Sequence, residues 1–301
     1  MDPESSSAER ALAEQVFSKH RPLLFTIAYE ITGTVADAED VLQESHLRWS
    51  STDPEGIGNH RAYLAKIVTR QALNVLRSTR RRREDYVGPW LPEPVATLPD
   101  VAEDAVLAES LSFAMLVVLE SLSPDQRAVF ILREVFDFPY DEIAEAMGKT
   151  TASVRQLAHR AKDHVAGRTP RFDVDHRKRK DVTDRFVAAT MGGDVQALMD
   201  VLAPGAVLLS DGGGKVSAAR RPVVGAVNVA RFLLGLAGKP LPAMRVELSL
   251  LNAMPAILIY SGGRLDLAVV VEAGNDHVTG LYLVRNPDKL GAAATTRRLS
   301  R

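Results

Sequence analysis

The sequence predicts a multidomain protein in which two all-α modules precede an α+β domain. Apolar residues recur at helical spacing through the first part of the chain, a helix-turn-helix pattern follows, and short strand-like runs dominate the last third. The length of 301 residues exceeds what one compact core usually needs. We place the helical modules at residues 1–84 and 107–168, a linker at 85–106, and the α+β domain at 180–290.

The overall charge of the chain favours no particular kind of partner. Lysine and arginine number 37 against 38 aspartates and glutamates, so a nucleic-acid surface requires local segregation of charge. The chain has no cysteine, which excludes disulfides and thiolate metal sites. Its polar, acidic start and the lack of an apolar run of membrane-spanning length predict a soluble, cytoplasmic protein with no membrane partner.

Two helices are expected before residue 50, and Gly33 supplies the turn between them. Thr34 stands three positions before Asp37, which is the spacing of a helix cap. The stretch "DAEDVLQESHLRW" that follows has one apolar face and one acidic face, so it packs on one side and displays carboxylates on the other. An acidic stripe taken alone is most often a solvated surface.

The next expected helix, at residues 60–84, carries positive charge instead. Leu64, Ile67, Val68 and Leu76 keep core spacing, while lysine and arginine accumulate at other positions. Such a density of arginine is typical of a surface that neutralises phosphates, although a solvated face is the simpler alternative.

The linker contains "YVGPWLPEPVATLPD", in which four prolines exclude a helix and favour an extended path. Trp90 is a large aromatic residue among these prolines. Because such a side chain usually docks onto another surface, we expect the linker to contact another part of the protein.

A helix-turn-helix is expected within "LSPDQRAVFILREVFDFPYDEIAEAMGKTTASVRQLAHRA". Ser123 caps a helix that Pro124 opens, a short helix covers "YDEIAEAM", Gly148 supplies the turn, and a further helix runs from about Thr151. The apolar residues of this last helix face inward, which leaves its polar residues to face a DNA major groove. The pattern also occurs by chance in helical proteins.

Taken together, the acidic stretch and the helix-turn-helix stretch resemble regions two and four of the extracytoplasmic-function sigma factors of bacterial RNA polymerase, over roughly the first 165 residues. The resemblance implies two all-α sigma domains, a region 2 helical bundle and a region 4 helix-turn-helix. Its implied partners are core RNA polymerase and the minus-ten and minus-thirty-five elements of promoter DNA. Core polymerase would be bound by Asp37, Asp40, Gln43 and Glu44. The minus-ten element would be contacted by Arg61, Lys66, Arg70, Asn74, Arg77 and Arg80. The minus-thirty-five element would be contacted by Ser153, Arg155, Gln156, His159 and Arg160.

The remainder is expected to fold as helices followed by a curved sheet, with a helix near 227–236 and strands at 244–251, 256–259, 266–271 and 279–284. This order is similar to the SnoaL-like (NTF2-like) cone domain. The alternatives for this domain are a sensor that binds an apolar small molecule, or an acid–base enzyme that uses Asp211, Asp266, Asp276 or His277. We expect no enzyme activity, no cofactor and no metal.

The run "DGGGK" at 211–215 superficially resembles a phosphate-binding loop. Val216 stands where such a loop needs serine or threonine, and no βαβ unit surrounds it, so phosphate binding is not expected. Together with "WLPEP" and "NPDKL", the run resembles a sigma-factor subgroup that carries a regulatory SnoaL-like extension. The resemblance implies an interdomain regulatory set. It comprises Trp90, Leu91, Pro92, Glu93, Pro94, Asp211, Gly212, Gly213, Gly214, Lys215, Asn286, Pro287, Asp288, Lys289 and Leu290. We expect the glycine turn to meet the linker near Trp90, with Lys215 paired to Glu93.

Overall fold

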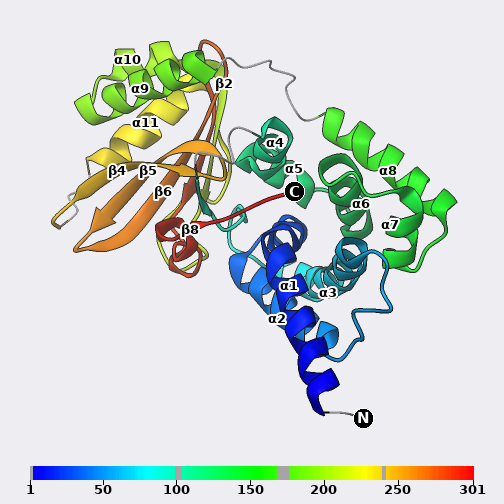
Figure 1. Ribbon diagram of the computed structural model, residues 1–301. Coiled ribbons are helices and arrows are strands. Elements are labelled where there is room, and N and C mark those ends of the chain that lie inside the picture. The colour runs from blue at the N-terminus through cyan, green and yellow to red at the C-terminus, as the bar shows by residue number, and fades with distance from the viewer. Residues whose placement is uncertain (1–2, 99–103, 168–175, 239–241) are drawn as a thin grey trace.

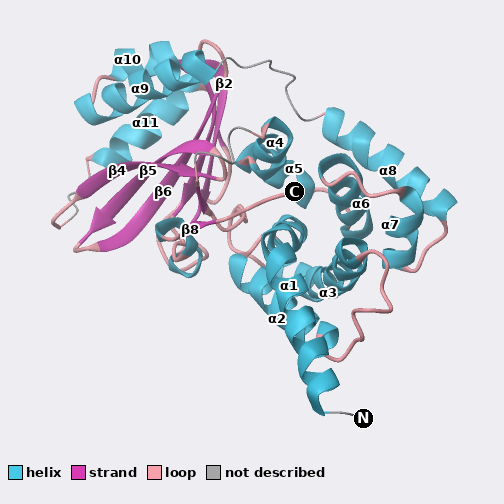
Figure 2. Cartoon of the chain, in the orientation of Figure 1, coloured by secondary structure: helices cyan, strands magenta, loops and turns pink. Residues whose placement is uncertain are grey.

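The computed structural model describes residues 3–98, 104–167, 176–238 and 242–301. Two helical modules lie side by side, and a sheet with its own helices lies against them (Figure 1). Figure 2 shows that the strands form one continuous layer, with helices α9, α10 and α11 covering one of its faces. The expected order of two helical modules and one α+β domain is therefore confirmed.

The first module consists of α1 (Pro3–Thr32), α2 (Val35–Trp49) and α3 (His60–Glu84). Gly33 turns the chain between α1 and α2 at a φ of +80°, a conformation that glycine adopts without strain. The side chain of Thr34 accepts the Asp37 N–H, as the sequence predicts. Trp49 is fully buried and donates its ring N–H to the Ala13 carbonyl at 2.7 Å, which ties the end of α2 to α1.

The second module contains six helical segments. They are α4 (Ala105–Leu111), α5 (Phe113–Glu120), α6 (Pro124–Phe130), the π-helical turn η2 (Ile131–Val135), α7 (Tyr140–Met147) and α8 (Thr151–Ala166). Ser123 and Gln126 form a reciprocal cap at the start of α6, and Gly148 adopts a left-handed conformation between α7 and α8. The predicted helix-turn-helix is confirmed, and the π-helical turn that continues α6 was not predicted.

The third part is built on an eight-stranded sheet in the order β3-β2-β7-β6-β5-β4-β1-β8. The strands are β1 (Ala96–Thr97), β2 (Leu202–Asp211), β3 (Val223–Val224), β4 (Arg245–Leu251), β5 (Met254–Ser261), β6 (Arg264–Ala273), β7 (Val278–Val284) and β8 (Thr296–Arg297). The helices are α9 (His176–Gly192), α10 (Val195–Val201) and α11 (Ala226–Ala237), with short 3₁₀ turns η3 (Pro287–Lys289) and η4 (Ala292–Ala294). The predicted helix and all four predicted strands of this domain's second half are present.

The sheet has two apolar faces because side chains alternate along each strand. On β6, Leu267, Val269 and Val271 pack toward α9, α10 and α11. Ala268 and Val270 point to the other face, where they pack with Leu91 of the linker and Phe113 of α5. The second face is therefore a contact surface between the sheet and the helical modules.

Two strands of the sheet come from outside the predicted α+β domain. β1 belongs to the linker, and its Ala96 pairs with Leu251 of β4. β8 belongs to the C-terminal tail and pairs with β1 in parallel. A strand of two residues is too short to show a periodic pattern in the sequence, so it forms because a neighbouring strand pairs with it. The linker is thus built into the sheet.

Candidate functional site

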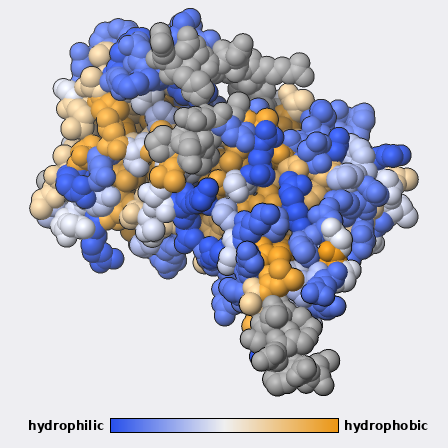
Figure 3. Space-filling view, viewed as in Figure 1, coloured by the Kyte–Doolittle hydropathy of each residue, from blue (hydrophilic) through white to orange (hydrophobic). Residues whose placement is uncertain are grey.

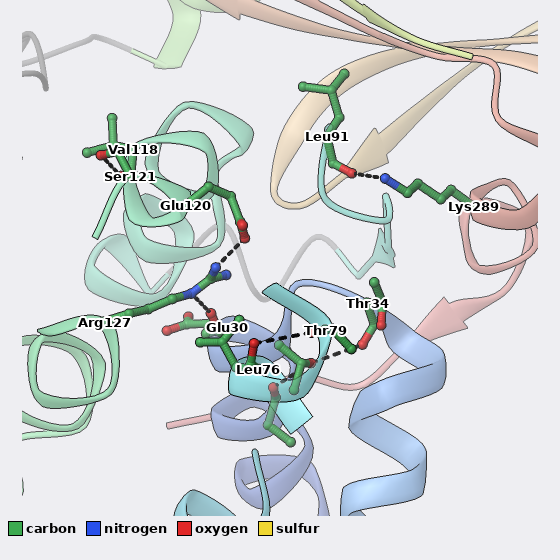
Figure 4. Close-up of polar contacts among 12 residues, drawn as sticks. Glu30, Thr34, Leu76, Thr79, Leu91, Val118, Glu120, Ser121, Arg127 and Lys289 are labelled. Carbon is green, nitrogen blue, oxygen red and sulfur yellow. Dashed lines mark hydrogen bonds and ion pairs between the residues drawn. The ribbon is translucent and has the colours of Figure 1, made fainter. Parts of the chain in front are cut away.

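The linker segment from Leu91 to Thr97 is buried between the first helical module and the sheet, and we call this contact the linker junction. At its centre Asp211, at the end of β2, accepts the Leu91 N–H at 2.9 Å. Lys289 of η3 donates to the Leu91 carbonyl at 2.6 Å and to Asp211 at 2.8 Å. Asp211 is 0% and Lys289 8% exposed, so this ion pair is buried. Figure 4 shows Lys289 reaching Leu91.

Aromatic side chains of the linker surround this ion pair. The ammonium of Lys289 lies 4.0 Å from the centre of the Trp90 ring and 4.9 Å from that of Tyr86. The Tyr86 hydroxyl donates to the second oxygen of Asp211 at 2.7 Å and accepts from the Asn286 amide at 2.8 Å. Burial, with the hydrogen bond to Asp211, raises the pKa of Tyr86.

The glycine run allows two other segments to approach the backbone closely. A Cβ atom on Gly213 would lie 2.5 Å from the Asn286 amide nitrogen, and one on Gly214 would lie 3.4 Å from Val87 of the linker. Both glycines also have positive φ angles, +62° and +70°. The structure thus brings "WLPEP", "DGGGK" and "NPDKL" together at one place.

The prediction that Lys215 pairs with Glu93 is wrong. Lys215 pairs with Asp288, and both side chains are more than half exposed. Glu93 instead accepts the Val35 N–H at 2.7 Å, at the first turn of α2, where an anion is favourable. Burial raises the pKa of Glu93, and hydrogen bonds from the backbone of α2 oppose that rise. Glu93 therefore attaches the linker to the first module.

A bridge that the sequence did not predict crosses the junction through Tyr29 and Asn252. Tyr29 of α1 donates to the Glu93 carbonyl at 2.7 Å and accepts from the Asn252 amide, also at 2.7 Å. Asn252, in the turn between β4 and β5, accepts the Val95 N–H at 2.9 Å and donates its own N–H to the Val95 carbonyl at 2.8 Å. These bonds join the first module, the linker and the sheet.

A second buried polar group lies where the two helical modules meet. Arg127 of α6 is 1% exposed, donates to the Glu30 carbonyl at 2.8 Å and forms an ion pair with Glu120 (Figure 4). The Glu30 carboxyl accepts from the Ser110 hydroxyl at 2.7 Å, and burial raises its pKa to about 8. This buried cluster was not predicted from the sequence, because its charged residues have no local motif around them.

The C-terminal tail, residues 295–301, adds a further contact between the parts. Arg297 pairs with Glu39 of α2, and the Ser300 N–H donates to the Thr26 hydroxyl of α1 at 3.1 Å. Arg301 pairs with Asp104, which caps α4, at 2.6 Å. In Figure 1 this tail runs from the sheet to the place where the helical modules meet. The predicted domain, which ended at residue 290, did not include it.

The residues predicted to bind core polymerase lie along one side of α2. Asp40, Gln43 and Glu44 are exposed, whereas Asp37 is half-buried. Gln43 also lines a groove of about 270 Å³ between α1 and α2, together with Phe17 and Leu42. This side of α2 offers carboxylates beside an apolar groove.

Four of the residues predicted to contact the minus-ten element bond to the second helical module; of these, Arg61 and Lys66 are half-buried, whereas Arg70 and Arg77 remain exposed. Arg61 donates to the Phe136 carbonyl at 3.2 Å, and Lys66 pairs with Glu145. Arg70 donates twice at 2.8 Å, to the carbonyls of Ala146 and Glu145. Arg77 pairs with Asp125 at 2.6 Å. Asn74 is exposed, and the Arg80 side chain lies outside the described part of the structure.

The residues predicted to contact the minus-thirty-five element lie on the outer side of α8. Arg155, Gln156, His159 and Arg160 are exposed, and Ser153 is half-buried with its N–H bonded to the Thr150 hydroxyl. Val154, Leu157 and Ala161 are buried on the inner side. This helix therefore presents a polar surface of the kind that enters a major groove.

We expect Arg155→Ala and Arg160→Ala each to weaken binding to a promoter's upstream element by about 1–3 kcal/mol, because each removes an exposed cation from the side of α8 that we predict to contact DNA. Fluorescence anisotropy with a labelled upstream duplex measures the change. Lys162→Ala is the matched control, since Lys162 pairs with Glu134 at 3.1 Å. If the parent, the two arginine variants and the control all bound the duplex equally tightly, α8 would not be a DNA-recognition helix.

Of the four candidate acid–base residues, only Asp276 and His277 are brought together. Asp211 belongs to the linker junction, and Asp266 pairs with Arg285 at 2.8 Å. Asp276 and His277 line an open depression of about 560 Å³ beside α9.

No helix among the described residues is long and apolar enough to cross a membrane.

Comparison with known proteins places these features in one family. The chain matches the family model "Sigma-70 region 2" over residues 16–82 and "Sigma-70, region 4" over residues 112–165. It is 38% identical over 297 residues to the ECF RNA polymerase sigma factor SigJ of Mycobacterium tuberculosis, covering 94% of both chains. It is 30% identical over 277 residues to the probable ECF RNA polymerase sigma factor SigI of the same species, covering 90% of this chain and 92% of the relative. The crystal structure of M. tuberculosis SigJ is similar with a TM-score of 0.72 at 36% identity, over 92% of this chain and 97% of that one.

Proposed function

Because the chain belongs to the extracytoplasmic-function family of RNA polymerase sigma factors, it serves transcription initiation, and we propose that its C-terminal domain regulates this step. In the proposal the domain holds the linker and both helical modules in the closed arrangement described above. Opening this arrangement frees the chain to bind core polymerase and both promoter elements. The site of action is then the cytoplasm, and the chain itself catalyses no reaction.

The observation that carries the proposal is the contact between α3 and the second helical module. Arg61, Lys66, Arg70 and Arg77 are engaged by carbonyls and carboxylates of η2, α6 and α7 or the loops beside them. These cations would otherwise be available to neutralise promoter phosphates, which supply much of the affinity for DNA. The closed arrangement therefore competes with phosphate binding by these cations, most strongly at the half-buried Arg61 and Lys66.

At the linker junction the C-terminal domain binds the linker directly, which stabilises the closed arrangement. The amide groups of Leu91, Glu93 and Val95 donate to Asp211, to the Gly33 carbonyl and to Asn252. Alternate linker residues are thus bound to the C-terminal domain and to the first module. Because one chain must contact two promoter elements at once, a linker held in place restricts the separation of the two modules.

The alternative functions for the C-terminal domain receive less support. An acid–base enzyme needs its carboxylates and histidine within reach of one substrate, and of the four candidates only Asp276 and His277 line the same depression, which is open. A sensor for an apolar molecule needs space on the helix-covered face, which Val182, Phe186 and Leu198 occupy in the described core. Regulation through the linker is therefore the function that we assign to this domain.

We expect the two helical modules to separate when the protein joins core polymerase on promoter DNA. Two cysteines introduced at exposed Gln15 and Ala166 can carry dyes specifically, because the chain has no cysteine of its own. Energy transfer between the dyes should be lower in the promoter complex than in the free protein. Equal transfer in both states would contradict the proposal.

A further inference from the structure

Strand β4 has a largely free edge on the outer side of the sheet. On its inner side all seven residues pair with β5, from Arg245 to Leu251. On its outer side, among the described strands, only Leu251 is paired, with Ala96 of β1. The backbone groups of residues 245–250 that point outward are therefore available to another strand.

The free edge carries exposed apolar side chains, which isolated edge strands usually avoid. Met244 is 57% and Leu248 60% exposed, and Val246 between them is half-buried. Phe232 and Leu236 of α11 are also half-buried on this helix-covered side of the sheet. Figure 3 shows apolar surface over α11. Together these side chains form an apolar face that a neighbouring strand would extend and cover.

The charged residues of β4 make this edge complementary to itself. Arg245 and Glu247 are exposed, pair with each other along the strand, and lie on its opposite face because they alternate with the apolar residues. In an antiparallel pair centred on Val246, Arg245 of each copy lies opposite Glu247 of the other. Met244 of each copy then lies opposite Leu248, and Val246 lies opposite itself. Opposite charges and apolar pairs at facing positions both stabilise a sheet.

Neighbouring registers are less favourable. A pair centred on Glu247 would place two carboxylates opposite each other, which destabilises a sheet. A pair centred between Glu247 and Leu248 would leave Arg245 opposite Leu250 and Glu247 opposite Leu248, with no ion pair. The charge pattern therefore selects the register centred on Val246.

We propose that β4 is a self-association surface, on which a second copy of this chain pairs antiparallel to the first and continues the sheet. The ladder is bounded at one end by Pro242, which has no N–H, and by Ala243, whose φ is +46°. It is bounded at the other end by β1, which occupies Leu251. Leu251 lies five residues from the centre, about 17 Å along the strand. The linker junctions of the two copies therefore lie at opposite ends of the shared ladder and remain clear of the contact.

Sedimentation of the full chain over a concentration series tests this surface. We expect a reversible dimer with a dissociation constant on the order of 10 µM, as for a small interface. Leu248→Lys should leave a monomer over the same range. The control Arg264→Glu alters an exposed charge at the start of β6, which is separated from this edge by β5 and β4, and should dimerise like the parent.

The decisive variants exchange the charges. Arg245→Glu and Glu247→Arg should each weaken self-association about tenfold or more, because each places like charges opposite one another twice. A mixture of the two single variants should form a mixed dimer, and the double variant should regain the parent's affinity. A parent that stays monomeric, or a dimer indifferent to these changes, would overturn the proposal. A mixture that stays monomeric would overturn it equally.

Discussion

Replacing Asp211 with alanine is expected to release the linker and to raise promoter-dependent transcription. Asp211 is buried and accepts hydrogen bonds from the linker, from Tyr86 and from Lys289. Removing one member of a buried ion pair leaves the other charge buried without compensation, which costs about 3–5 kcal/mol. The contacts that hold the closed arrangement should therefore weaken strongly. Transcription from a cognate promoter with purified core polymerase measures the result.

Two further variants separate this effect from general damage to the domain. Asp288→Ala removes the exposed ion pair with Lys215, which joins the same two loops as the buried pair between Asp211 and Lys289. This variant should change transcription little. Asn252→Ala leaves the ion pair intact but removes the bonds that its side chain makes to Val95 and Tyr29. It should raise transcription in the same direction as Asp211→Ala. An unchanged or reduced yield from both junction variants would argue against a repressive closed arrangement.

The double reversal Asp40→Lys and Glu44→Lys is expected to abolish binding to core polymerase. Both side chains are exposed on α2, so the fold should tolerate the change. Placing like charges across an interface costs several kcal/mol, which corresponds to a loss of affinity of at least about a hundredfold. Co-purification with core enzyme and a binding titration both report it.

The control for this pair is Glu109→Lys, which reverses an exposed carboxylate on α4, away from that side of α2. It should bind core polymerase like the parent. If the double variant still co-purifies with core enzyme at the parent's level, α2 is not the polymerase-binding element.

Much of the fold follows from local signals in the sequence. The cap at Thr34, the helix opened by Pro124 and the left-handed Gly148 each depend on a few neighbouring residues. The same holds for β6, where a short continuous run of apolar residues, buried on both faces of the sheet, is itself the signal of a strand. Such features are predictable because their physical causes lie within one or two turns of the chain.

The linker junction was only partly predictable. The three motifs suggested that the linker meets the glycine turn, but the partner of Lys215 depended on which acid lies nearest in space, and Asp288 is that acid. Tyr29 and Asn252 are 223 positions apart in sequence and carry no local signal of their contact. Nor does the spacing of basic residues on α3 indicate whether phosphates or protein carbonyls face them.

The most direct test is to lock the closed arrangement with a cross-link and to measure transcription. With no native cysteine, Lys66→Cys and Glu145→Cys place two unique thiols where α3 meets α7, and a short cleavable bis-maleimide can join them. Transcription is measured before cross-linking, after it and after cleavage, with a monofunctional maleimide as the control for modification. We expect cross-linking to abolish promoter-dependent transcription and cleavage to restore it. Undiminished transcription by the cross-linked protein would contradict a repressive role for the closed arrangement.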